Sequence, residues 1–159
     1  MIFLTLLLFF VGADMKLTSQ AFQEGQPIPS TYTCHGKNVS PPLVIADVPK
    51  ETKTLAIIVD DPDAPLGTFV HWVAWNIPPQ DLNWGEGKVH HREGKNHMGK
   101  EGYFGPCPPP GKPHHYHFKI YALDTEFKLA QGATKEELLD NMDGHILAQA
   151  ELVGTYQRE

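Results

Sequence analysis

Five side chains that can bind or transfer protons stand where strand-like runs of this sequence begin or end. Asp61 and Asp63 follow one apolar run, His71 lies inside the next, and His114 and Tyr116 open a third. A carboxylate next to an imidazole favours the protonated ring. A protonated histidine can then form a charge-assisted hydrogen bond with an oxyanion, and a tyrosine hydroxyl can add a neutral donor. If the fold brings these segments together, they form a small anion site in which the carboxylates orient the histidines.

A glycine- and proline-rich loop leads into the third of these segments. Residues 102–113 contain three glycines, which permit unusual backbone angles, and five prolines, which lack N–H donors. Neither a helix interior nor a central strand fits such a sequence. The next run, residues 114–121, is aromatic and β-branched, and alternation would place His114 and Tyr116 on one face of a strand. The loop therefore offers backbone N–H groups and two polar side chains on a stiff support.

Two further apolar runs predict central strands. Residues 54–60 are almost entirely apolar, and residues 69–77 carry hydrophobic side chains on both faces. In the second run, a period of two would place His71 on the same face as Val73 and Trp75. A histidine buried in such a strand needs a hydrogen-bond partner.

Each of these features also has an ordinary structural explanation. His71 alone could be a satisfied core histidine, and Asp61 with Asp63 is common turn chemistry. His114 and Tyr116 could be aromatic strand residues and nothing more. The functional interpretation depends on their combination.

Shorter elements are predicted around this framework. The pattern indicates strands at residues 16–22, 43–45 and 150–156, and a long polar connection at residues 78–100. A connection of that length is uncommon unless it is functional or mobile.

One helix is predicted after the last long strand. Thr134 and Glu137 have the spacing of a capping box, so the helix should begin at Thr134 and run to about Leu147. The apolar residues expected to pack inward are Leu138, Leu139, Met142 and Ile146.

These elements predict a mainly β protein. The chain of 159 residues is long enough for one domain with a real core. Its strands are not interleaved with helices, so an antiparallel β-sandwich with one or two peripheral helices fits better than a doubly wound parallel sheet. The net charge of −6 argues against bulk binding to nucleic acid.

The N-terminal segment, residues 1–14, is strongly apolar, so the domain is expected to cover residues 15–159. The apolar run is too short to span a bilayer but suits a signal peptide cleaved after Ala13. Alternatively, Met15 is the true start and the segment is an upstream extension, or the segment is an element of the fold. The first interpretation would make the protein exported, and the second cytoplasmic.

Two cysteines, Cys34 and Cys107, are present. They could form a disulfide that closes a long loop, or remain two buried thiols as in a reducing cytosol. The sequence leaves both states open.

Taken together, several stretches resemble the phosphatidylethanolamine-binding protein family, most closely its bacterial and archaeal branch, usually labelled Raf-kinase-inhibitor-like. The resemblance runs from about Met15 to Tyr156, and its motifs are weak singly but specific jointly. They are Cys34-His-Gly-Lys-Asn-Val-Ser-Pro-Pro42, Asp61-Pro-Asp-Ala-Pro65, Phe69-Val-His-Trp72, Gly102-Tyr-Phe-Gly-Pro-Cys-Pro-Pro-Pro-Gly111 with His114-His-Tyr116, Tyr121-Ala-Leu-Asp124, and Gly144-His-Ile-Leu-Ala148 with Ala150-Glu-Leu-Val-Gly154.

The resemblance implies a large antiparallel sheet packed on a smaller one, with a small anion pocket at one end. The residues it implies for ligand binding are Asp61, Asp63, His71, Gly105, Pro106, Pro108, His114 and Tyr116. It also places the loops of Cys34 and Cys107 beside that pocket.

The function implied by the resemblance is non-catalytic binding without a cofactor. The expected ligand is a phosphate-bearing small molecule, such as a phospholipid head group, or a phosphorylated or acidic group of a protein partner. The expected role is that of an inhibitor or modulator of a kinase, protease or signalling partner. The oligomeric state, monomer or homodimer, is left open.

Two other functions compete with anion binding. The aspartates and histidines could bind a divalent metal, although the sequence has no His-x-x-x-His helical pair with a Glu between. A hydrolase is the other, but there is no Gly-x-Ser-x-Gly motif. A thiol nucleophile at Cys107 with His114 as its base is disfavoured by the prolines on both sides of the cysteine.

Overall fold

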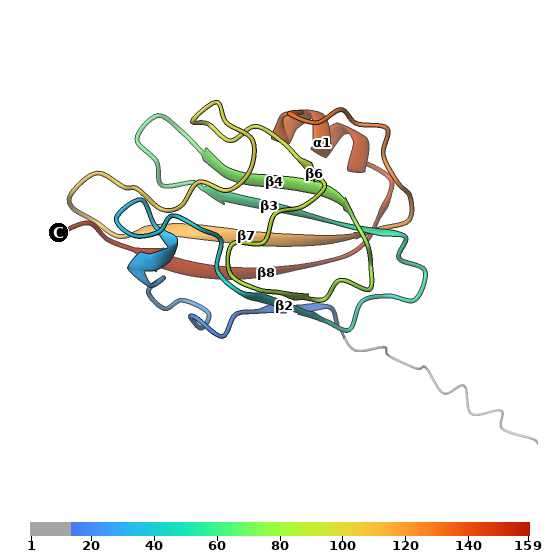
Figure 1. Ribbon diagram of the computed structural model, residues 1–159, viewed down its shortest axis with the longest axis horizontal. Coiled ribbons are helices and arrows are strands. Elements are labelled where there is room, and N and C mark those ends of the chain that lie inside the picture. The colour runs from blue at the N-terminus through green and yellow to red at the C-terminus, as the bar shows by residue number, and fades with distance from the viewer. Residues whose placement is uncertain (1–13) are drawn as a thin grey trace, which may run out of the picture.

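The computed structural model describes residues 14–159 as two β-sheets and a short helix (Figure 1). The interpretations of the N-terminal segment concern residues that, apart from Asp14, lie outside this described part. Within residues 14–159, no helix is long and apolar enough to cross a membrane.

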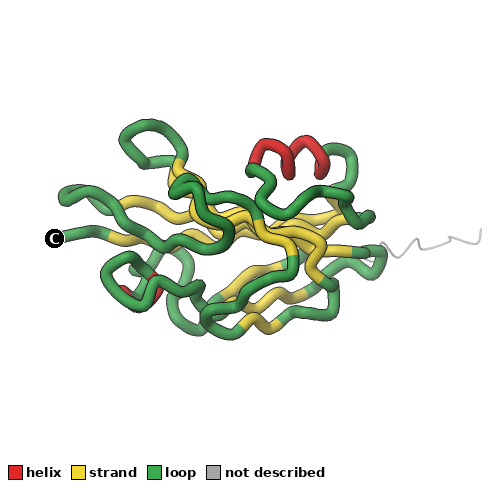
Figure 2. Tube along the Cα trace, turned by 45° about the horizontal axis from the view of Figure 1, so that its top comes forward, coloured by secondary structure: helices red, strands yellow, loops and turns green. Residues whose placement is uncertain are grey.

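The two sheets form the predicted sandwich, a large sheet on a smaller one (Figure 2). Every pairing between neighbouring strands is antiparallel. The five-stranded sheet has the order β6 (Arg92–Glu93), β4 (Phe69–Ile77), β3 (Thr54–Asp61), β7 (His114–Leu123) and β8 (Ile146–Tyr156). The three-stranded sheet has the order β1 (Lys16–Thr18), β2 (Leu43–Ala46) and β5 (Asn83–Trp84). The predicted fold class is therefore confirmed.

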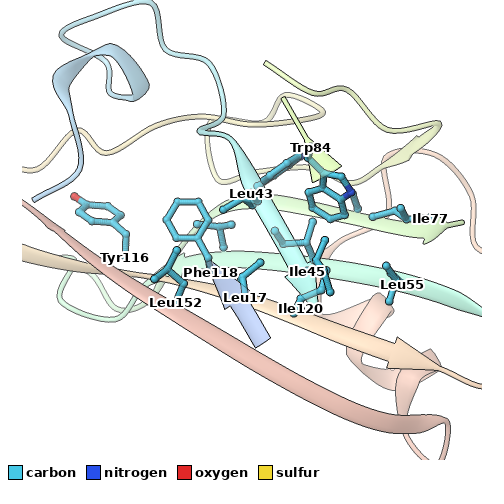
Figure 3. Packing of buried hydrophobic residues seen from close by; sticks show 14 of the residues in the cluster. Leu17, Leu43, Ile45, Leu55, Ile77, Trp84, Tyr116, Phe118, Ile120 and Leu152 are labelled. Carbon is cyan, nitrogen blue, oxygen red and sulfur yellow. The ribbon is translucent and has the colours of Figure 1, made fainter. Parts of the chain in front are cut away.

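The main core lies between the two sheets. All eight residues of β3 are buried, because this strand is paired on both edges and covered on both faces. Figure 3 shows side chains from both sheets meeting in this layer, among them Leu43 from the small sheet and Phe118 and Leu152 from the large one. Burial of such side chains is the principal stabilising contribution to a fold of this kind.

A second core lies on the opposite face of the large sheet, beneath helix α1 (Lys135–Met142). The predicted capping box is confirmed: the Thr134 hydroxyl accepts from the Glu137 backbone N–H, and the Glu137 side chain accepts from the Thr134 backbone N–H. Leu138 and Met142 are buried as expected.

The predicted end of the helix was wrong. The helix stops at Met142, and Gly144 adopts a positive φ of 79°, which starts a turn instead of another helical turn. Leu139 is 38% exposed, and Ile146 is 44% exposed and begins β8. The last strand consequently starts earlier than predicted.

The long connection at residues 78–100 has structure of its own. It contributes β5 to the small sheet and β6 to the edge of the large one. A short 3₁₀ helix at Ser30–Tyr32 precedes the loop that carries Cys34.

A β-bulge in β4 overturns the prediction that His71 shares a face with Val73 and Trp75. Asp60 pairs with Val70, whereas the preceding residue of β3, Val59, pairs with Trp72, so His71 is an additional residue in β4. An additional residue changes the phase of the side-chain alternation.

The bulge turns His71 away from the helix side of the sheet. Val73 and Trp75 pack in the core under the helix, whereas the His71 ring meets the Tyr116 ring edge-on at 5.2 Å between ring centroids. Tyr116 belongs to the core between the two sheets.

Candidate functional site

A cavity of about 240 Å³ opens at the end of the sandwich where the glycine- and proline-rich loop lies. Figure 1 shows this loop at the same end of the molecule as the C-terminus. Five of the eight predicted ligand-binding residues line the cavity: Asp61, His71, Pro108, His114 and Tyr116. Three separate segments of the chain therefore converge on one site.

Asp61 and His114 form a buried pair in the wall of the cavity. Asp61 ends β3 and His114 begins β7, and Asp61 Oδ2 lies 2.6 Å from His114 Nδ1. The other carboxylate oxygen, Oδ1, accepts the Asp63 backbone N–H at 2.8 Å. Both carboxylate oxygens of Asp61 accept hydrogen bonds, so Asp61 fixes the His114 imidazole, and no described residue bonds to His114 Nε2.

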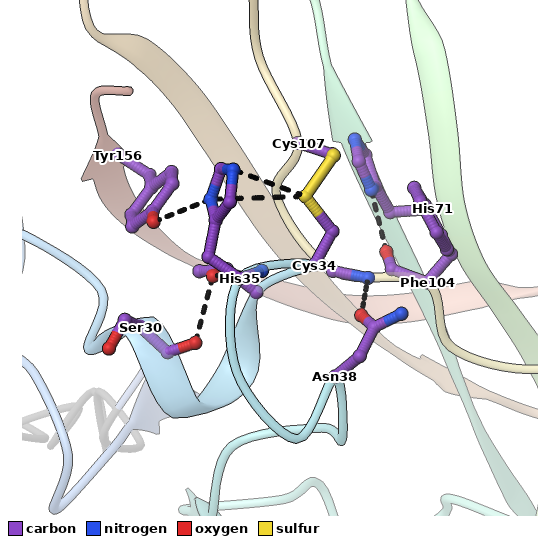
Figure 4. The surroundings of a disulfide bond; sticks show 10 residues. Ser30, Cys34, His35, Asn38, His71, Phe104, Cys107 and Tyr156 are labelled. Atoms are coloured by element: carbon purple, nitrogen blue, oxygen red, sulfur yellow. Dashed lines mark hydrogen bonds between the residues drawn. A yellow bond between two sulfur atoms is a disulfide. The ribbon is translucent and has the colours of Figure 1, made fainter. Parts of the chain in front are cut away.

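His71 is held by a reciprocal pair of hydrogen bonds with Phe104. Its Nδ1–H donates to the Phe104 carbonyl at 2.6 Å (Figure 4). In return, the Phe104 N–H donates to the His71 carbonyl at 2.9 Å. Because a carbonyl can only accept, this bond places a proton on Nδ1 and leaves Nε2 as the second ring nitrogen. Burial lowers the pKa of His71 below its usual value, more than the nearby Asp61 raises it.

Tyr116 places a buried hydroxyl beside these rings. The residue is 1% exposed, and its hydroxyl has no hydrogen-bond partner among the described residues. Burial, together with the negative charge of Asp61, raises the pKa of Tyr116, so the hydroxyl stays protonated and remains a donor. A buried polar group without a partner is unusual and destabilising, and here it borders a cavity.

The other three predicted residues do not line the cavity. Asp63 accepts from the backbone N–H and from Nδ1 of His115, at 2.8 and 2.7 Å, on the exposed side of the turn. Gly105 donates its N–H to Asn38 Oδ1 at 2.7 Å, so this amide is not available to a ligand. The Pro106 carbonyl accepts from the Cys34 N–H at 3.1 Å.

The packing of Gly105 explains why a glycine is needed there. A Cβ atom at this position would stand 2.2 Å from the Tyr32 carbonyl oxygen. Gly105 therefore serves close packing between two loops, and its role in the cavity is indirect.

Most of the cavity wall is apolar, and most of these apolar residues were not among the residues predicted for the site. The remaining lining residues are Ala64, Pro65, Phe69, Met98, Phe104, Cys107 and Pro109. Phe69 and Phe104 stood inside the recognised motifs, and their position beside His71 could have identified them. No sequence pattern marked Met98 as a site residue, because it lies in the long connection at residues 78–100, outside the recognised motifs.

The two cysteines are joined in a disulfide, with 5.4 Å between their Cα atoms. The bond connects the loop after the 3₁₀ helix to the glycine- and proline-rich loop, and Cys107 borders the cavity (Figure 4). With Cys107 engaged in this bond, the thiol nucleophile required by the hydrolase hypothesis is absent.

The described part of the chain offers no cluster of side chains that could bind a metal ion. Across residues 14–159, no group of three or more His, Cys, Asp and Glu side chains is arranged to hold a metal ion. His71 and His114 each direct one ring nitrogen to a protein partner, Phe104 and Asp61 respectively.

Comparison with known proteins gives a consistent result. The sequence model of the family described as phosphatidylethanolamine-binding protein matches residues 18–157. A UPF0098 protein of Pyrococcus abyssi is 50% identical over 157 residues, which cover 93% of this chain and 88% of that protein.

Two crystal structures show the same fold. A phosphatidylethanolamine-binding protein homolog of Chlamydia trachomatis is 47% identical, with a TM-score of 0.88, and the match covers 92% of this chain and 99% of that one. The Escherichia coli protein YbcL, a member of the mammalian family, is 31% identical, with a TM-score of 0.86, and the match covers 92% and 100% of the two chains.

Proposed function

The chain belongs to the phosphatidylethanolamine-binding protein family, and from that premise we propose that it is a non-catalytic binding protein whose end cavity takes an anionic, phosphate-type group. The group belongs to a small molecule, such as a phospholipid head group, or to a phosphorylated or acidic side chain of a protein partner. Binding of this group is the means by which the protein would inhibit or modulate such a partner.

The observation that carries this proposal is the unpartnered Tyr116 hydroxyl next to two anchored histidines. Nδ1 of His71 and Nδ1 of His114 are occupied, and no described residue bonds to either Nε2. Three potential donors thus converge on one cavity, and no described residue accepts a hydrogen bond from the hydroxyl. An oxyanion would satisfy all of them.

The carboxylate of Asp61 supports this arrangement although it is itself negative. Its two oxygens already accept hydrogen bonds from His114 and from the Asp63 backbone. Its charge therefore faces the His114 imidazole, which it holds in place at the cavity wall.

Calorimetric titration across pH 5.5–8 tests the proposal. Inorganic sulfate is the better probe, because its charge does not change in this range, and inorganic phosphate is the comparison. Because burial lowers the pKa of His71, the free protein must take up a proton to pair this ring with an anion. Affinity should therefore rise as the pH falls, and the titration heat should depend on the ionisation enthalpy of the buffer.

Two variants sharpen the test. His71→Ala removes a charge-assisted hydrogen bond and should weaken binding by about 1.5–3 kcal/mol. Asp61→Asn should also weaken binding at neutral pH, since His114 loses its counter-charge. An affinity that is flat with pH, together with tighter binding by Asp61→Asn, would show that the carboxylate merely repels anions and that the proposed pocket chemistry is wrong.

A further inference from the structure

We propose that the Cys34–Cys107 disulfide is a thiol-exchangeable latch that holds one wall of the cavity in place. Small-molecule thiols or dithiols would open it, and opening would release the wall and weaken binding in the cavity. This proposal rests on the proposed function in one respect: the loss of binding is measured with an anion that the proposed function assigns to the cavity.

The wall in question, residues 107–110, contains one buried residue, Pro108, and is otherwise exposed. Just before it, Gly105 and Pro106 are hydrogen-bonded to Asn38 and Cys34. Just after it, Gly111 is bonded to the C-terminal residues 157–158. Between these points, no hydrogen bond from the described part of the chain reaches residues 107–110, and three of the four are prolines without an N–H. Apart from the packing of Pro108, the disulfide is therefore the link between this stretch and the rest of the described chain.

This stretch is also part of the cavity. Cys107, Pro108 and Pro109 line it together with His71 and Phe104. Figure 4 shows the disulfide close to the His71 and Phe104 side chains. Movement of the stretch would therefore change the shape of the cavity without breaking the hydrogen bonds that hold the two histidines.

The surroundings of the two sulfurs favour exchange in one direction. Cys107 is exposed, whereas Cys34 is half-buried next to His35, both of whose ring nitrogens lie 3.9 Å from Cys34 Sγ. The His35 ring is held in this position by Tyr156, whose hydroxyl is 2.9 Å from Nδ1. A histidine beside a cysteine favours the thiolate, which makes Cys34 the better leaving group.

The chemistry is ordinary thiol–disulfide exchange. A thiolate RS⁻ attacks Cys107 Sγ, the S–S bond breaks, and the electron pair leaves on Cys34 as a thiolate. A second RS⁻ then attacks the outer sulfur of the RS–S–Cys107 mixed disulfide. This step forms RS–SR, leaves Cys107 as a thiolate, and oxidises two reductant thiols as the protein disulfide is reduced.

The first experiment measures the rate of reduction of the native protein by dithiothreitol, followed by alkylation and mass spectrometry. We expect complete reduction without denaturant, and a several-fold lower rate for His35→Gln. The matched control is His91→Gln, which changes an exposed histidine on the edge of the large sheet and should leave the rate unchanged. A bond that is reduced only after unfolding, or equal rates for both variants, would overturn the assignment.

The second experiment compares the oxidised protein, the reduced and alkylated protein, and the Cys34→Ser/Cys107→Ser variant. Hydrogen–deuterium exchange should rise on reduction at Cys34 and Gly111, whose N–H groups donate to Pro106 and Arg158, while the strands stay protected. Sulfate affinity should fall about tenfold. By linkage, saturating sulfate should then lower the reduction potential of the disulfide by about 30 mV, because it binds the oxidised form more tightly.

The outcomes separate the two proposals. If the oxidised protein binds no sulfate and no phosphate, the proposed function fails, and the latch is judged by the exchange at Cys34 and Gly111 alone. If that exchange does not change on reduction, the latch is wrong whatever the cavity binds. If the double variant does not fold, reduced wild-type protein gives the same comparison.

Discussion

At the scale of single residues, the cavity combines satisfied and unsatisfied polar groups. Asp61 and His114 are paired and buried, and His71 is tied to the backbone of Phe104. The Tyr116 hydroxyl has no hydrogen-bond partner within residues 14–159. A fold selected for stability alone would place a phenylalanine at this position, because an unpaired buried hydroxyl costs free energy.

Tyr116→Phe should therefore separate stability from binding. In the unliganded protein, we expect the free energy of unfolding to stay unchanged or to rise by about 1 kcal/mol, because the unpaired hydroxyl is removed. Anion affinity should fall by about 0.5–1.5 kcal/mol, because a neutral donor is lost. Chemical denaturation and calorimetric titration with sulfate measure the two effects. A variant that is less stable and binds sulfate equally well would show that the hydroxyl has a structural partner, not a ligand.

At the scale of elements, one additional residue in β4 decides how the site is built. The bulge at His71 brings this side chain to the Tyr116 side of the sheet, while Val73 and Trp75 remain under helix α1. β-Bulges commonly reorient a side chain next to a functional site.

The connection between β4 and the glycine- and proline-rich loop also carries a buried histidine. His90 is 7% exposed, and its ring packs against Trp72 of β4 and Trp84 of β5, at 5.5 and 4.4 Å between ring centroids. Burial lowers the pKa of His90 to about 4, and the charge of Lys88 contributes in the same direction.

We expect His90 to destabilise the protein in acid. In the unfolded chain, His90 binds a proton below pH 6.5, whereas the folded protein resists protonation until about pH 4. Stability is therefore lost as the pH falls through this window, by about 3 kcal/mol from this residue.

His90→Phe keeps an aromatic ring between the two tryptophans and removes the titration. The difference in unfolding free energy between variant and wild type should grow by about 3 kcal/mol from pH 7 to pH 4. Urea denaturation at several pH values measures it, with the exposed His91→Gln as the control that should follow the wild type. A difference that does not depend on pH would mean that His90 binds its proton equally well in the folded and the unfolded protein.

At the scale of the whole molecule, two cores on opposite faces of one sheet stabilise the domain. The larger core joins the two sheets, and the smaller one lies beneath the helix. The first described residue of either core is Met15.

A truncated protein beginning at Met15 should consequently have the same thermal midpoint as the full chain. Met15 and Leu17 are buried and should be retained, whereas the residues before them are predicted to lie outside the domain. Differential scanning calorimetry of both proteins tests this prediction. A large drop in the midpoint on truncation would show that residues 1–14 pack against the domain, as in the third interpretation of that segment.

The sequence by itself determined the fold class, the family and most strand positions. Local patterns carry this information: an uninterrupted apolar run predicts a strand buried on both faces, and a capping box marks the start of a helix. The range predicted for β4, residues 69–77, is the one observed, and the capping box at Thr134 is observed as well. Five of the eight residues proposed for the ligand site line one cavity, although no local pattern shows that three segments meet.

Only the tertiary structure decided the end of the helix, the side of the sheet on which His71 lies, and the partners of the loop groups. Ile146 is taken into β8 because pairing with β7 outweighs continuation of the helix. His71 changes side because it is an additional residue in β4: it lies between Val70 and Trp72, whose partners in β3 are consecutive residues. The Gly105 N–H donates a hydrogen bond to the side chain of Asn38, a residue 67 positions away in the chain. Each of these outcomes depends on which segments lie next to each other in space, and alternation or propensity along the chain does not contain that information.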